Sequence, residues 1–170
     1  MNSILETERL ILREFTTEDA PFILKLVNSP GWLEFIGDRK IRTEEQARFY
    51  LENGPIKSYK EHGYGLSMVA LKQDETPIGM CGIINRANLE NPDIGFAFLP
   101  EYIRQGYGLE IAAATMKFAH ENLKLQTVCA ITVTGNIASI RLLEKLGMKF
   151  SGMINFPDDP VDLMLYRMDY

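Results

Sequence analysis

Hydrophobic residues recur along the chain with two spacings, one typical of strands and one typical of helices. In residues 93–99, Ile94, Phe96 and Phe98 occupy alternate positions, and the residues between them are also apolar or small. A strand with two apolar faces is usually covered on both sides, so this segment should lie inside a sheet. The apolar residues from Leu109 to Leu123 then follow at spacings of three and four, which predicts a long helix.

The same patterns, bounded by turn and cap residues, predict the order β-α-α-β-β-β-α-β-α-β-β. Strands are expected in residues 10–12, 64–71, 77–84, 93–99, 127–133, 148–154 and 161–168. A first helix is expected from the cap candidates Thr16 and Thr17 to about Asn28, and Pro30 and Gly31 should end it. A second helix should begin at Thr43, which forms a capping box with Gln46. Two more helices are expected, one from about Gly106 and one from Ile137 to Leu146 with Gly147 as its C-cap. Early hairpins followed by β-α-β crossovers predict a mixed α/β (α+β) fold, with a central sheet of about six to seven strands and helices on both faces.

Length, charge and cysteine usage limit the class of protein. A chain of 170 residues, 46% apolar and 24% charged, is expected to form one domain over residues 1–170. A formal net charge of −5 argues against a nucleic-acid partner, because phosphate binding requires a concentrated basic surface. Cys81 and Cys129 lie far apart without a metal-ligand pattern, so no metal is expected. The sequence has no secretory leader and no apolar run of ~20 residues, which predicts a cytoplasmic protein that does not bind a membrane.

One short segment between the strand and the long helix carries candidate chemistry. It reads Arg104-Gln105-Gly106-Tyr107-Gly108. Successive backbone N–H groups in such a loop converge with the positive end of the helix dipole, which makes a site for a phosphate group. The alternative is that Gly106 and Gly108 only form a tight turn. A dinucleotide fingerprint is excluded because Ile111 stands where a third glycine is needed, and no nucleotide-binding run of the Gly-Lys-Ser/Thr type occurs.

The loop and a later segment carry a resemblance to a known family. Residues 103–108 resemble the Gln/Arg-x-x-Gly-x-Gly/Ala coenzyme A motif of GNAT acetyltransferases, and residues 136–148 resemble that family's segment from an Asn to Lys-x-Gly-Phe. Residues 7–13 and 77–82 are similar to the RimJ/RimL-like branch, which acetylates the N-termini of ribosomal proteins. Ile103 stands where the family usually has Gln or Arg. Backbone amides would therefore carry the pyrophosphate of the coenzyme.

The resemblance implies acetyl-CoA as co-substrate and a central sheet whose middle strands splay apart. Phe96, Phe98 and Leu99 would then bind the pantetheine arm as an added strand, with the Phe98 N–H polarising the thioester carbonyl. Asn136 and Ser139 would contact the pantetheine arm or the sulfur. Each also has a structural alternative, since Asn136 is well placed to cap the helix that follows it and Ser139 to act as a first-turn hydroxyl.

The group that protonates the leaving thiolate departs from the family pattern. Many members have a Tyr seven residues after the motif Asn, and this chain has Leu143 there. We therefore hypothesise that Ser139, with Asn136 or a water molecule, stabilises the departing sulfur.

The general base is open among three carboxylates. Glu101 directly follows the thioester-binding strand, and Glu34 and Asp38 lie in the segment expected to meet the acceptor. An α-amine has a pKa of about 8 and needs little help to lose its proton.

These patterns predict an N-acetyltransferase that moves an acetyl group from acetyl-CoA to a primary amine. The amine is either a protein N-terminus or a small molecule, and the sequence does not choose between them. The alternative is an acyl-CoA-binding sensor or scaffold of the same fold without catalysis. The oligomeric state stays open, a homodimer included.

Overall fold

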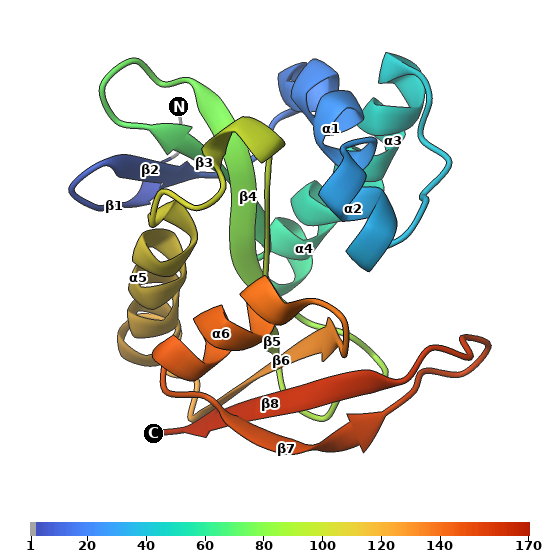
Figure 1. Cartoon of the computed structure of the whole chain (residues 1–170). Helices are drawn as coiled ribbons and strands as arrows, with labels where there is room; N and C mark the ends of the chain where they lie inside the picture. The colour runs from blue at the N-terminus through green and yellow to red at the C-terminus, as the bar shows by residue number, and fades with distance from the viewer. Residues whose placement is uncertain (1–2) are drawn as a thin grey trace.

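The computed structural model describes residues 3–170, which build one sheet of eight strands (Figure 1). The strands are β1 Ser3–Glu6, β2 Leu10–Arg13, β3 Leu66–Leu71, β4 Pro77–Ile84, β5 Asp93–Phe98, β6 Thr127–Val133, β7 Lys149–Ile154 and β8 Leu163–Asp169. Their order across the sheet is β1-β2-β3-β4-β5-β6-β8-β7. Within residues 3–170, β5 and β6 pair in parallel and all other neighbours are antiparallel. The predicted mixed sheet is confirmed, with a strand count above the expected one because the short β1 was not predicted.

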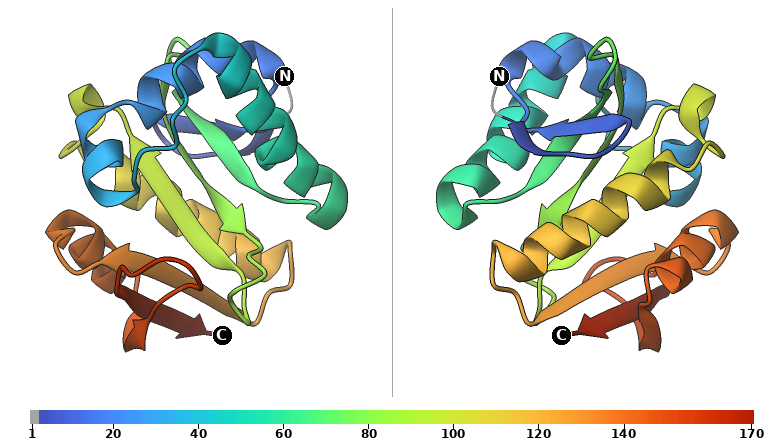
Figure 2. Two further views of the ribbon diagram at one scale, coloured as in Figure 1. Left: turned by 90° about the vertical axis from the view of Figure 1, so that its right-hand side faces the viewer. Right: turned by 90° about the vertical axis from the view of Figure 1, so that its left-hand side faces the viewer.

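Helices cover both faces of the sheet. They are α1 Ala20–Val27, α2 Pro30–Phe35, α3 Glu44–Asn53, α4 Pro55–His62, α5 Tyr107–Glu121 and α6 Ile137–Lys145, with short 3-10 helices at Thr17–Asp19 and Pro100–Tyr102. The helices α1 to α4 gather on one side, α5 crosses the opposite side, and α6 lies beside β6 (Figures 1 and 2).

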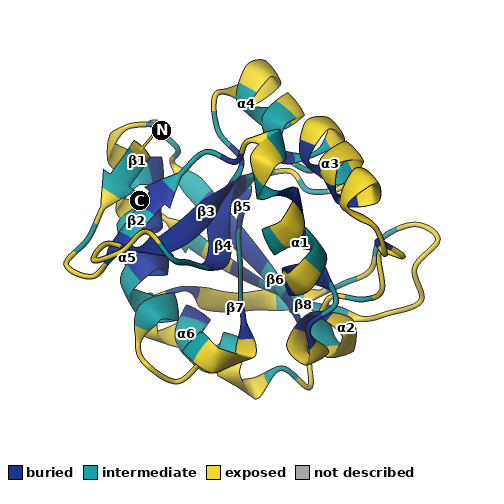
Figure 3. Ribbon diagram, turned by 90° about the horizontal axis from the view of Figure 1, so that it is seen from above, coloured by how far each residue is buried: buried dark blue, intermediate teal, exposed yellow. Residues whose placement is uncertain are grey.

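The sheet separates two hydrophobic cores, because neighbouring residues of a strand point to opposite faces. Val69 and Ile94 belong to the core that includes α5, whereas Met68 and Leu99 belong to the core under α1 to α3. Strands β3 to β5 lie between these helical layers in Figure 3. The expectation that residues 93–99 are covered on both faces is confirmed.

Two helices begin at prolines that the sequence analysis did not use as helix starts. Pro30 was expected to end a helix, yet it opens α2, and Pro55 opens α4. Proline suits the first turn of a helix because its missing N–H would be unpaired there in any case. Glu61 and His62 form the last turn of α4, which Gly63 closes with a φ of 80°.

The central strands β5 and β6 meet at one point and then part. Their register contains a single pair, Asp93 with Cys129, and the Cys129 N–H donates to the carbonyl of Pro92 at 2.9 Å. Beyond this point the two strands run in the same direction and diverge, as Figure 2 shows from two sides. The predicted splay is thus confirmed, and we call the opening between β5 and β6 the wedge.

A buried ion pair lies at the closed end of the wedge. Arg86 Nε donates to both carboxylate oxygens of Asp93, at 3.0 and 3.2 Å, and the Asp93 side chain is only 1% exposed. Burial raises the pKa of the Asp93 carboxyl, and the Arg86 guanidinium opposes that rise. The carboxylate therefore depends on Arg86 for its charge.

We expect Asp93→Ala to destabilise the protein by about 1–3 kcal/mol, because Arg86 loses the partner that compensates its partly buried charge. Chemical denaturation measures the free energy of unfolding. Glu61→Ala is the matched control, since Glu61 pairs with Lys57 at 3.8 Å on the exposed surface of α4 and should change stability little. Equal effects of the two substitutions would contradict the structural role given to Asp93.

Candidate active site

Strand β5 turns two pairs of backbone groups toward the wedge. The Leu99 N–H donates to the carbonyl of Ile78, in the neighbouring strand β4, at 2.9 Å. Hydrogen-bonded and non-hydrogen-bonded pairs alternate along an antiparallel ladder, so Ala97 also bonds toward β4. Phe96 and Phe98, between them, direct their N–H and C=O groups to the other edge. That edge borders the wedge, where β6 has already diverged.

The loop after β5 has the geometry of an anion site. Arg104 and Gly106 have φ values of 62° and 82°, and no side chain caps the N-terminus of α5. The first N–H groups of a helix have no partner within it, and the helix dipole adds partial positive charge there. The loop therefore presents unpaired donors at the open end of the wedge, where the sequence predicted phosphate binding.

The two glycines of this loop serve different purposes. Gly106 adopts a left-handed backbone conformation that a residue with a side chain enters only at a cost. A Cβ at Gly108 would lie 2.9 Å from Leu142 Cδ1, at the end of a flexible side chain of α6. Gly106 is thus required for the loop conformation, whereas Gly108 allows α5 and α6 to approach each other.

Of the other loop side chains, some contact other residues of the protein and one does not. Gln105 Nε2 donates to the Glu101 carbonyl at 2.7 Å, and the Tyr107 ring lies 6.5 Å from that of Tyr102. The guanidinium of Arg104 is exposed and bonds to no other residue in the described part of the chain. Arg104 is therefore the loop's available cation.

A second helix begins at the same end of the wedge. Because β5 and β6 are parallel, the helices that follow them both start at the open end. Asn136 Oδ1 accepts from the Ser139 N–H at 3.2 Å, so the predicted capping role of Asn136 is confirmed. Both residues are half-buried, and within residues 3–170 neither the Asn136 Nδ2 nor the Ser139 hydroxyl bonds to another residue. These two groups remain available to a ligand.

Leu143 cannot take part in proton transfer. Its side chain is 1% exposed and belongs to the core that includes α5. At the position where the family resemblance implies a Tyr, this chain therefore has a packing residue and no acid.

The three carboxylates considered as general base lie on the side of α1 to α3. Glu101 is exposed and pairs with Lys25 of α1 at 3.5 Å. Asp38 pairs with Arg42 at 2.7 Å, and this hydrogen bond lowers the pKa of the Asp38 carboxyl. Glu34 is exposed on α2. Of the three, Asp38 is the one most firmly held in an ion pair of its own.

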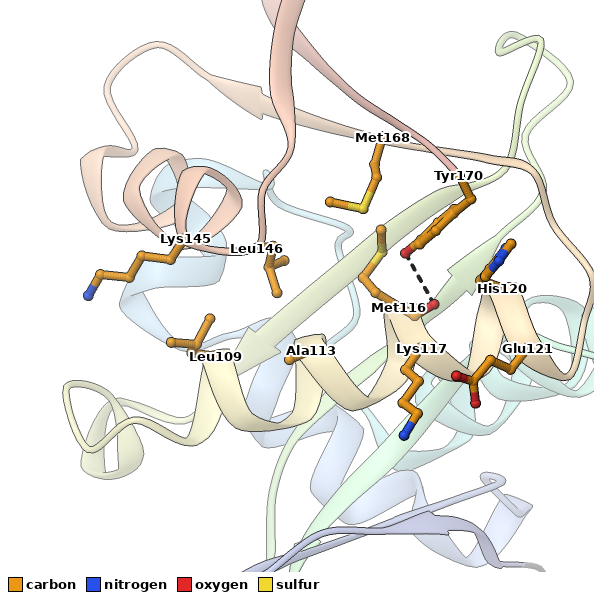
Figure 4. A pocket seen from close by; sticks show the side chains of 10 residues that line it. All are labelled: Leu109, Ala113, Met116, Lys117, His120, Glu121, Lys145, Leu146, Met168 and Tyr170. Atoms are coloured by element: carbon orange, nitrogen blue, oxygen red, sulfur yellow. Dashed lines mark hydrogen bonds between the residues drawn. The ribbon is translucent and has the colours of Figure 1, made fainter.

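A hollow of about 340 Å³ lies between α5, α6 and the end of β8 (Figure 4). Its floor includes Leu109, Ala113 and Leu146, and the ammonium groups of Lys117 and Lys145 lie at its margins. The sequence analysis did not single out these two lysines. Lys145 could have been found from the sequence, because it lies inside the segment of residues 136–148 that resembles the family motif.

The described part of the chain comprises residues 3–170. It contains no cluster of three or more His, Cys, Asp or Glu side chains that could hold a metal ion. None of its helices is long and apolar enough to cross a membrane.

Comparisons with known proteins agree with this geometry. Residues 9–149 match the model of a family described as an acetyltransferase (GNAT) domain. The uncharacterized N-acetyltransferase YoaA of Bacillus subtilis is 28% identical over 156 residues, which cover 91% of this chain and 87% of YoaA.

Two solved structures share the fold. RimL, a ribosomal L7/L12 α-N-protein acetyltransferase in complex with coenzyme A, superposes with a TM-score of 0.81 at 16% identity, covering 99% of this chain and 98% of RimL. Spermidine N-acetyltransferase from Vibrio cholerae, in complex with coenzyme A and spermine, gives a TM-score of 0.77 at 16% identity, covering 96% of each chain.

Proposed function

The chain belongs to the GNAT acetyltransferase family and is an N-acetyltransferase, and we propose that it transfers an acetyl group from acetyl-CoA to a primary amine by direct attack on the thioester. The observation that carries this proposal is the wedge. It combines outward-facing backbone groups of Phe96 and Phe98 with the anion site at the start of α5. A linear coenzyme with a pyrophosphate at one end and amide groups along its arm matches that combination.

Acetyl-CoA would bind mainly to backbone atoms. Its pyrophosphate meets the N–H groups of residues 104–108 and the free guanidinium of Arg104. Its pantetheine arm pairs with Phe96 and Phe98 as an added strand up to Leu99. The nucleotide end extends toward the hollow between α5 and α6, where Lys117 and Lys145 can meet its remaining phosphate.

The reaction needs an activated carbonyl and a stabilised leaving group. The Phe98 N–H donates to the thioester oxygen, and a preorganised donor of this kind contributes ~3 kcal/mol to transition-state stabilisation. The amine nitrogen bonds to the carbonyl carbon and loses a proton to the base through water, the C–S bond breaks, and the thiolate takes up a proton from water. Ser139 supplies a hydroxyl hydrogen bond to that sulfur, with Asn136 or water beside it, because Leu143 is buried.

The acceptor amine must reach the carbonyl as a neutral nucleophile. Glu101, acting through water, is the base that we assign, and Glu34 and Asp38 are its alternatives. The two neighbours act on a protein N-terminus and on a polyamine, and each of these substrates carries a primary amine. The net charge of −5 favours approach of either cationic substrate. The thiols of Cys81 and Cys129 are buried and form no disulfide, which is consistent with a protein that functions in the reducing cytoplasm.

A non-catalytic acyl-CoA sensor is the second candidate, and the observation that favours it is the buried Leu143 in place of an acid. Release of free thiol from acetyl-CoA, measured with a panel of N-terminal peptides and polyamines, separates the two. An enzyme gives turnover that depends on the added amine. Tight binding of acetyl-CoA without amine-dependent release would instead identify a sensor.

The two loop glycines give a matched prediction. Gly106→Ala should weaken coenzyme A binding by about tenfold or more, because a left-handed conformation costs an L-residue about 1–2 kcal/mol and the loop would relax out of it. Gly108→Ala should retain binding, since its only close contact would be with the movable end of the Leu142 side chain, and the Phe98 ring would lie at an ordinary contact distance of 3.6 Å. Calorimetry with coenzyme A measures both. Equal losses would argue that the left-handed conformation is not what the site needs.

Substitution of Ser139 tests the leaving-group assignment. Ser139→Ala should lower kcat by about a hundredfold, at the lower end of the range of acid–base contributions, while the KM for acetyl-CoA stays the same. Steady-state kinetics provides both constants, and Ser151→Ala, on the exposed part of β7, is the control. Full turnover in Ser139→Ala would show that another group stabilises the departing sulfur.

A further inference from the structure

The turn between β1 and β2 packs against the start of α5 (Figure 1). Glu110, in the first turn of α5, receives three hydrogen bonds from it. Thr7 Oγ1 donates to Glu110 Oε1 at 2.6 Å, the Arg9 N–H donates to the same oxygen at 2.9 Å, and Arg9 Nε donates to Oε2 at 2.7 Å. A carboxylate with this many donors fixes the turn to the helix that carries the coenzyme loop.

The other side of the Arg9 guanidinium contacts the loop itself. Nη1 donates to the carbonyl of Gln105 at 3.0 Å. Nη2 lies 3.2 Å from the position that a Cβ of Gly106 would occupy. Cζ lies 4.3 Å from the centre of the Tyr107 ring, a cation–π distance. One planar cation thus contacts Gln105 and Tyr107 and lies beside Gly106, three successive residues of the proposed pyrophosphate site.

The contact with the Gln105 carbonyl determines where a ligand-binding N–H points. In a planar trans peptide, the C=O and the following N–H point in opposite directions. Because Arg9 holds the Gln105 carbonyl on its own side, the Gly106 N–H is directed away from Arg9. The left-handed Gly106 then sets the next peptide in the loop.

The charge of Arg9 is already engaged. Partial burial opposes ionisation of Glu110, but hydrogen bonds from Thr7 and Arg9 outweigh it and lower the pKa of this carboxyl. Glu110 is therefore ionised at neutral pH and balances the guanidinium. The loop's unpaired cation is Arg104, so Arg9 acts on the loop through geometry.

We infer that Arg9 is a positioning residue for acetyl-CoA, which holds the backbone of residues 105–107 in the conformation that binds the pyrophosphate. The inference rests on the proposed function and extends it to a residue outside the coenzyme loop.

Coenzyme A binding by calorimetry and steady-state kinetics test this role. Arg9→Ala should weaken coenzyme A binding and raise the KM for acetyl-CoA by about tenfold, which corresponds to about 1.4 kcal/mol. The kcat at saturating acetyl-CoA and the KM for the amine should stay within about twofold. The control is Lys72→Ala. Lys72 bonds to the Thr7 carbonyl at 3.3 Å and to Glu6 at 3.0 Å, in the same region of the hairpin, and neither contact involves the loop.

A truncated donor separates positioning from general loss of structure. Acetyl-pantetheine lacks the pyrophosphate and the nucleotide, so its kcat/KM should be the same in the unmodified protein and in Arg9→Ala. Equal losses with both donors would overturn the inference, because damage to the fold does not distinguish between them.

Arg9→Lys separates geometry from charge. An ammonium keeps the charge but cannot bond Glu110 and the Gln105 carbonyl with one planar group, so its affinity for coenzyme A should fall close to that of Arg9→Ala. Full affinity in Arg9→Lys would overturn the inference. If the unmodified protein binds coenzyme A but acetylates no amine, the catalytic proposal fails and the binding test of Arg9 still stands.

Discussion

The structure depends on a backbone constraint, the single register pair that joins β5 to β6. Strands β1 to β5 form an antiparallel unit, and β6, β8 and β7 form another, so the sheet is continuous only at this pair. Beyond it, the edge of β5 carries N–H and C=O groups without a strand opposite them. Unpaired backbone groups are costly when they are shielded from water, so such an edge is stable only where water or a ligand reaches it. The incomplete sheet therefore leaves a row of backbone groups in the wedge that a ligand can bind.

The parallel direction of these two strands has a further effect. Each is followed by a helix, and both helices start at the open end of the wedge, at Gly106 for α5 and at Asn136 for α6. Their unpaired first-turn groups thus face the same region from two sides. The ion pair of Arg86 and Asp93 lies at the opposite, closed end. The length of β5 thus separates the unpaired first-turn groups of α5 and α6 from the ion pair of Arg86 and Asp93.

Much of this architecture could be predicted from local patterns in the sequence. Alternation in residues 93–99 predicted a strand covered on both faces, and Asn136 was correctly expected as a helix cap. The helices α2 and α4 were missed because Pro30 and Pro55 each suit both the end of one element and the start of another. The Leu143 position illustrates a different limit, since only packing shows that its side chain points into the core.

The contacts of Arg9 could not be predicted, because they join residues that are distant in the sequence and depend on how the β1–β2 hairpin packs on α5. The same reasoning explains why the acetyl donor is easier to identify than the amine that accepts the acetyl group. The proposed coenzyme site consists largely of backbone groups, so a side-chain change such as the exposed Ile103 leaves its donors in place. Among the residues of this loop, only Gly106 is required as a residue type, because its left-handed backbone conformation favours glycine. An acceptor site is formed by side chains whose identities are free to differ, and neighbours at 16% identity accordingly act on a protein in one case and on a polyamine in the other.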